Sequence, residues 1–169
     1  CLLSRGLGDV YKRQKLLFKQ RFFSWLDSYD IYNEQGETVF TVEGQFSWGH
    51  CLHVLNEAGE HIGTLQEKVW SFLPRFELYA YGDYLGSMQK EFTFLTPRYT
   101  MEGSDWEVEG NFLEWEYTIQ SPSQGLIAAI SKEVLNWTDT YTIDVADSAN
   151  ALCALLVVLA IDAEKCGRN

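Results

Sequence analysis

The sequence lacks the short motifs that mark the common catalytic and nucleotide-binding sites. It contains no Gly-x-Ser-x-Gly elbow, no P-loop, no Gly-x-Gly-x-x-Gly fingerprint and no His-Glu-x-x-His zinc motif. No nucleophile is placed beside a recognisable base. We therefore expect no catalytic residues, no metal ligands and no cofactor.

Positive charge is scarce, with 13 Lys and Arg against 24 Asp and Glu and a net charge of −11. Residues 1–14 carry three basic residues and one acidic residue, so the rest of the chain has a net charge of −13. A strongly acidic domain repels phosphate backbones and anionic lipid surfaces at long range. Nucleic acid is therefore not an expected partner, and general electrostatic attraction to membranes is disfavoured.

Residues 1–14 also differ from the rest of the chain in pattern, because they show no apolar alternation and do not begin with Met. We expect residues 1–14 to be a non-native leader, residues 15–166 to form a single domain, and residues 167–169 to be a tail. A domain of about 150 residues has room for a substantial core.

The sequence also lacks an apolar run long enough to span a bilayer and cysteines at metal-binding spacing. The longest apolar run, Ala151–Ile161, is shorter than the about 20 residues that span a bilayer. Residues 15–21 are basic, but their apolar part is too short for a secretory signal. Cys51, Cys153 and Cys166 show no metal-ligand spacing, and the last two are expected to act as small apolar residues. We expect no transmembrane span and a cytoplasmic location.

The sequence does contain a repeat. Five glycines recur at intervals of 21 to 23 residues, each between two stretches of alternating apolar and polar residues. They are Gly36, Gly59, Gly82, Gly103 and Gly125. A fixed period of this length indicates one repeated supersecondary unit, and glycine is typical of a hairpin turn. With a sixth interval ending at residues 144–148, the pattern predicts about twelve antiparallel strands, each with one buried face.

The segment 149–166 departs from this alternation. Its run Ala151–Ile161 is wholly apolar and follows Asp147 and Ser148, which can cap a helix. A helix that is apolar on all sides must be buried on all sides. A closed sheet of about twelve strands is too wide to be filled by its own side chains. We therefore predict an all-β fold with one helix, a closed antiparallel barrel wrapped around its C-terminal helix.

Several local stretches, together with this arrangement, resemble a bacterial member of the LURP-one-related family. The stretches are residues 29–36, 40–49, 68–74, 106–112, 128–132 and 160–163. The resemblance extends over residues 15–166 and implies the tubby C-terminal-like barrel, a fold also attributed to phospholipid scramblases. Some tubby relatives bind phosphoinositides through basic surface residues, but this sequence has no contiguous basic cluster of that kind. The resemblance therefore assigns no lipid function to any residue.

Five basic residues near the expected strand ends are candidate ligand-binding residues. Lys68, Lys90 and Lys132 occupy near-equivalent positions of three repeats, and Arg75 and Arg98 follow the turn prolines. Lysines on strand faces commonly keep a sheet in solution and protect its edges, which is the interpretation we favour. The alternative is a band that binds phosphate headgroups.

Aromatic residues are expected in the loops between strands. They are Trp25, Trp48, Trp70, Phe72 and Trp137. We favour a role in capping the ends of the barrel. The alternative is an apolar rim that contacts lipid or protein.

Four other residues invite a functional interpretation. His50 and His53 are three apart and would point to opposite faces of a strand, so we do not expect them to share a metal ion. His61 follows a turn and is expected to be solvated. Asp162 lies near the end of the apolar helix, and we expect its carboxylate to make a structural hydrogen bond.

These observations favour a non-enzymatic binding or scaffold module, with phospholipid or another amphiphilic molecule as the first ligand to test. A structural or protein-interaction domain without a small ligand is the alternative, and an uncharacterised enzyme is the third. The sequence also allows peripheral association with a membrane.

Overall fold

The computed structural model describes residues 12–19, 28–91, 98–111, 114, 116–135 and 138–166. Twelve strands and two helices lie within these ranges. The strands are β1 (Gln14–Lys19), β2 (Ser28–Tyr32), β3 (Thr38–Gln45), β4 (Cys51–Asn56), β5 (His61–Glu67), β6 (Arg75–Ala80), β7 (Asp83–Glu91), β8 (Arg98–Glu102), β9 (Glu107–Asn111), β10 (Glu116–Ser121), β11 (Gly125–Leu135) and β12 (Thr138–Val145). The helices are a short 3-10 helix, Ser148–Asn150, and α1 (Ala151–Cys166).

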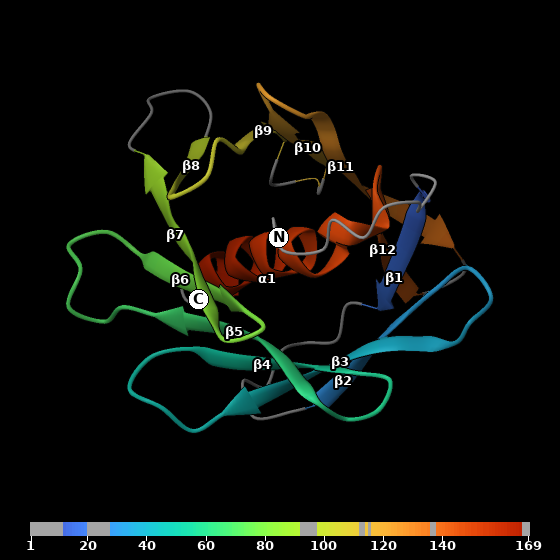
Figure 1. Cartoon of the computed structure of the whole chain (residues 1–169), viewed down its shortest axis with the longest axis horizontal. Helices are drawn as coiled ribbons and strands as arrows, with labels where there is room; N and C mark the ends of the chain where they lie inside the picture. The colour runs from blue at the N-terminus through green and yellow to red at the C-terminus, as the bar shows by residue number, and fades with distance from the viewer. Residues whose placement is uncertain are drawn as a thin grey trace.

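The strands form one closed antiparallel barrel, in which neighbours in sequence are also neighbours in space (Figure 1). The barrel closes where β1 pairs with β12, from Gln14↔Val145 to Lys19↔Thr140. Within the described residues, every strand pairs with a neighbour on each side. The predicted twelve-stranded antiparallel barrel is confirmed.

The recurring glycines lie in the turns, and side-chain hydrogen bonds explain the local sequence. Asn56 Oδ1 accepts hydrogen bonds from the N–H groups of Ala58 and Glu60 at 3.0 and 2.9 Å. Gly59 completes this turn with φ of +76°, a conformation that side-chain-bearing residues rarely adopt. The turn that begins at Asn33 repeats the same two bond lengths. One period of the sequence is therefore one hairpin of the barrel.

Antiparallel pairing gives the barrel two different ends. Each repeat brings the chain back to the same end, so the turns that contain the five recurring glycines lie together; we call this the glycine-turn end. The intervening connections lie at the opposite end, and two of them, residues 46–50 and 68–74, are fully described. We call this opposite end the aromatic-loop end. Helix α1 begins at the glycine-turn end, after β12, and runs through the barrel to the other end (Figure 1).

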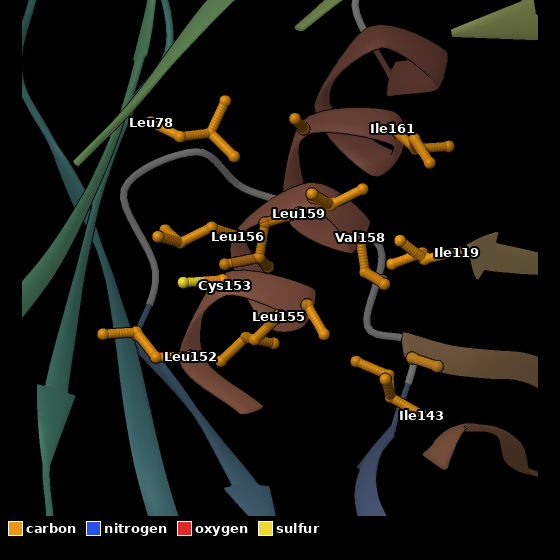
Figure 2. Packing of buried hydrophobic residues seen from close by; sticks show 14 of the residues in the cluster. Leu78, Ile119, Ile143, Leu152, Cys153, Leu155, Leu156, Val158, Leu159 and Ile161 are labelled. Atoms are coloured by element: carbon orange, nitrogen blue, oxygen red, sulfur yellow. The ribbon is translucent and has the colours of Figure 1, made fainter. Parts of the chain in front are cut away.

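Helix α1 fills the barrel, as predicted. Every residue from Ala151 to Glu164 is at most 5% exposed. Figure 2 shows Val158 facing Ile119 of the barrel wall, while Leu156 extends from another side of the helix. The helix has no exposed stripe because strands surround it. Among the described residues, no helix combines the length and the apolar character needed to cross a bilayer.

The β8–β9 hairpin lies beside the start of α1. The described pairs between β8 and β9 are Tyr99↔Val108 and Thr100↔Glu107, while Met101 and Glu102 pair with β7. Residues 103–106 connect β8 to β9. A cavity lies between this connection and the start of α1.

The first described residues contact the barrel. Residues 1–11 of the expected leader lie outside the described residues, whereas Gln14 begins β1. Arg13 Nε donates a hydrogen bond to Asp144 Oδ1 at 2.6 Å. The Ser148 N–H donates to the Lys12 carbonyl at 3.0 Å. Residues 12–14 therefore contact the barrel.

Candidate functional site

Two loops at the aromatic-loop end carry large apolar side chains that project into solvent. Phe46 and Trp48 lie between β3 and β4, and Trp70 and Phe72 lie between β5 and β6. These four aromatic side chains are 91–99% exposed. Val69, beside them, is half exposed. Figure 1 shows both loops extending from the end of the barrel at which α1 ends.

The two loops are joined at their bases by Glu67 and His50. The Glu67 N–H donates to the His50 carbonyl at 2.7 Å, and the His50 N–H donates to Glu67 Oε2 at 2.9 Å. Gly49, with φ of +92°, allows close approach, because a Cβ atom there would lie 2.6 Å from Val69 Cγ2. The aromatic side chains therefore extend from a hydrogen-bonded base.

The His50 ring lies behind these loops, with Nε2 3.7 Å from Glu67 Oε2. Burial lowers the pKa of His50, and the nearby Glu67 carboxylate acts in the opposite direction. The other two histidines stack on each other, and the ring centroids of His53 and His61 are 4.1 Å apart. Burial and the neighbouring His61 lower the pKa of His53. His61, which we expected to be solvated, also has Nε2 2.8 Å from Thr64 Oγ1.

The five candidate basic residues all lie toward the aromatic-loop end, but acidic partners hold four of them. Lys68 Nζ is 3.0 Å from Glu77, and an Arg75 nitrogen is 2.6 Å from Glu102. An Arg98 nitrogen is 3.5 Å from Glu109, and Lys90 Nζ is 3.1 Å from Glu164. Lys132 Nζ lies 5.9 Å from the ring centroid of Tyr141. The structure therefore brings these residues to one end without joining them into one cluster.

Lys90 belongs to a buried network that fixes the end of α1. Its Nζ donates to both carboxylate oxygens of Glu164, at 3.1 and 3.3 Å, and Tyr99 OH donates to Glu164 Oε2 at 2.9 Å. The Glu164 side chain is 2% exposed. This network joins β7 and β8 to the helix.

Asp162 lies two residues earlier in α1. The residue is buried, and its Oδ1 atom has no hydrogen-bond partner. The structural hydrogen bond expected for this carboxylate is therefore not made at Oδ1. Burial raises the pKa of Asp162 to about 7, with Lys165 acting in the opposite direction. The pKa of Tyr117 is raised by burial and by this carboxylate.

The remaining residues considered in the sequence are the possible metal ligands, the cysteines and two tryptophans. Among the described residues, no three His, Cys, Asp or Glu side chains are placed to hold a metal ion. Cys51 is a buried free cysteine whose thiol pKa is raised by burial. Cys153, expected to act only as a small apolar residue, is buried and disulfide-bonded. Trp25 and Trp137 lie outside the described residues.

Sequence reasoning named three of the four exposed aromatic residues in these two loops but favoured a capping role for them. Trp48, Trp70 and Phe72 cover none of the barrel in this structure, since each is almost completely exposed. Phe46 was missed, as was the connection between the two loops through Glu67. The available signal was the repeat itself, because every loop that alternates with a glycine turn must lie at the same end.

Comparison with known proteins supports one family and one fold. The sequence profile of the LURP-one-related family matches residues 14–162. The chain is 28% identical over 149 residues to the Bacillus subtilis protein named uncharacterized protein YxjI, covering 88% of this chain and 91% of that protein. An X-ray structure of an Arabidopsis thaliana protein superposes with a TM-score of 0.64 at 15% identity, covering 94% of this chain and 93% of that one.

Proposed function

This chain belongs to the LURP-one-related family, and we propose that it is a non-enzymatic, peripheral phospholipid-binding module whose contact surface is the aromatic-loop end. The contact residues are Phe46, Trp48, Trp70 and Phe72. The proposed location is cytoplasmic, at the surface of a membrane.

The observation that carries this proposal is the exposure of four aromatic side chains on two connected loops. Tryptophan and phenylalanine at loop tips suit the boundary between headgroups and acyl chains, where an apolar ring leaves water. Transfer of each side chain contributes about 2 kcal/mol, or about 8 kcal/mol for four before the cost of association is subtracted. After that cost is subtracted, binding to a bilayer would be weak and reversible.

The charge of the protein determines how strongly anionic lipids would contribute to this membrane contact. The chain carries a net charge of −11, and acidic partners already hold four of the five candidate basic residues. Attraction to anionic lipid is therefore weak, and the apolar loops supply most of the binding energy. Lys68 and Arg75 flank the second loop, where headgroup phosphates would compete for them with Glu77 and Glu102. We assign Lys90 and Lys132 to the scaffold because they contact α1 and Tyr141.

The second candidate function is a protein-interaction domain that uses the same aromatic surface. Exposed apolar patches serve both kinds of partner. We favour lipid because the side chains project individually from loop tips, a shape that a fluid interface accommodates.

Flotation with phosphatidylcholine vesicles tests the proposal. The full chain is expected to float with the vesicles at both 0.05 and 0.5 M salt, because apolar insertion is not screened. Trp48→Ser combined with Trp70→Ser should reduce the bound fraction at least tenfold without lowering the melting temperature. The matched control combines Tyr81→Ser and Tyr84→Ser, which remove exposed aromatic rings at the glycine-turn end.

Failure of the full chain to float with phosphatidylcholine vesicles would reject the proposal. Equal losses in the aromatic-loop variant and the control would reject the assigned surface. Binding that appears only with phosphatidylserine vesicles and disappears at 0.5 M salt would show that the basic residues, and not the aromatic loops, bind the membrane.

A further inference from the structure

A second site lies at the opposite end of the barrel. A cavity of about 250 Å³ lies between β7, β8, the connection 103–106, the turn before β11 and the start of α1. Leu85, Met101 and Trp106 form an apolar wall, and Asp105, Gln124 and Asn150 supply polar groups. The volume suits a molecule of about ten non-hydrogen atoms, somewhat below the range of drug-sized pockets.

Asn150 places a polar side chain in the wall of this cavity. It is only 8% exposed and it lines the cavity. Its backbone N–H donates to the Asp147 carbonyl at 2.9 Å. The side-chain amide is not among the enclosed polar atoms that lack a partner, and it lines the open space of the cavity. An amide in a cavity wall can pair with a polar group of a molecule bound there, which a leucine of similar size could not do.

Charge at the rim restricts what that group can be. Asp105 Oδ2 accepts hydrogen bonds from the hydroxyl groups of Ser121 and Ser123 at 2.7 and 2.5 Å. These bonds lower the pKa of Asp105, so the carboxylate is ionised at neutral pH. An anionic ligand beside it would be repelled. The apolar wall and the single amide then favour an uncharged molecule.

We propose that this cavity binds a small uncharged molecule that has an apolar body and one amide or carbonyl group, with the Asn150 amide as its hydrogen-bond partner. The site is independent of the aromatic-loop end and goes beyond the membrane function proposed above. Trp106 and Met101 contact the apolar body, and Asp105 excludes carboxylates of the same shape.

Benzamide and benzoate are suitable probes because they have nearly the same shape and differ in charge. In a titration of the isotopically labelled full chain followed by NMR, benzamide is expected to shift the signals of the Asn150 side-chain amide and the Trp106 indole N–H. Binding should saturate with a millimolar dissociation constant, in keeping with the small size of the probe. Benzoate should bind at least tenfold more weakly.

Two variants of the site and one control variant distinguish binding in the cavity from general effects on the protein. Asn150→Leu should keep the melting temperature and weaken benzamide binding at least tenfold, whereas Gln120→Leu, an exposed amide on β10, should leave binding unchanged. Met101→Trp should fill the cavity and abolish benzamide binding while Asn150 is intact. This variant therefore tests the binding site even if Asn150→Leu is unstable. Equal binding of benzoate, shifts confined to other residues, or no shift up to 20 mM benzamide would each overturn the proposal.

Discussion

Lys90 on β7 and Glu164 near the end of α1 form a buried ion pair between residues 74 positions apart in sequence. The Lys90 side chain is 18% exposed and the Glu164 side chain 2%. Tyr99 supplies a further hydrogen bond to the same carboxylate. Burying a carboxylate costs free energy unless a cation and hydrogen-bond donors compensate for the lost water. Lys90 and Tyr99 therefore stabilise the position of the end of α1 in the barrel.

Lys90→Met should strongly destabilise the protein, because it leaves the Glu164 carboxylate buried without its cation. We expect a loss of about 3–5 kcal/mol in the free energy of unfolding, measured by urea denaturation. Adding Glu164→Leu should recover much of the loss. Arg98→Met breaks an exposed pair with Glu109 and should cost less than about 1 kcal/mol. Equal effects of Lys90→Met and Arg98→Met would contradict the prediction.

Asp162 makes stability depend on pH in a definite direction. Its pKa is about 7 in the folded chain and 3.8 in the reference state, so the folded state binds the extra proton between these values. The contribution of this group to stability is therefore fully present below about pH 4, falls as pH rises toward 7, and is lost above it. The full shift corresponds to roughly 4 kcal/mol.

Asp162→Asn removes this titration and should raise the free energy of unfolding at pH 8.5 by several kcal/mol, with little change at pH 4.5. Urea denaturation at the two pH values measures it. Asp83→Asn, at an exposed turn, is the control. The same effect of Asp162→Asn at both pH values would show that the Asp162 carboxylate is not buried as described.

The absence of an exposed stripe on α1 can be tested by an aspartate scan from Ala151 to Ile161. Leu156→Asp should cost several kcal/mol, and Leu152, Leu155 and Leu159 should be equally intolerant, because each is at most 4% exposed. Thermal melting of each variant provides the measurement, with Gln120→Asp on the outer surface as control. Tolerance that recurs every three to four residues would contradict a central position for the helix.

The two asparagine turns offer a test of the repeat. Asn33→Ala and Asn56→Ala each remove two side-chain hydrogen bonds to backbone N–H groups. We expect each to cost about 1 kcal/mol, and the double variant to cost the sum, because the turns share no partners. Urea denaturation of the four proteins completes the cycle. A clearly non-additive double variant would indicate that the turns are coupled.

The barrel and its central helix were predictable because both follow from periodicity. Gly59 recurs one period after Gly36, and the apolar run that contains Leu156 can be buried only inside a closed sheet. The candidate sites were less predictable because they depend on contacts between distant positions. Nothing local to Lys90 indicates Glu164, and nothing around Asn150 indicates that it shares a cavity with residues 103–106. Asp162 shows the same limit, since its unpaired oxygen depends on which strands surround the helix end.

The place of α1 in the chain has a consequence for how the protein is made. Synthesis proceeds from the N-terminus, so all twelve strands leave the ribosome before the helix that fills them. Until then, the inward faces of residues such as Val54, Leu65 and Leu78 have no core to cover them. The nascent chain therefore has a long interval in which apolar strands are exposed, and it is then most open to aggregation and to chaperone binding. Completion of the barrel is a late event, governed by the last apolar segment rather than by the first hairpins.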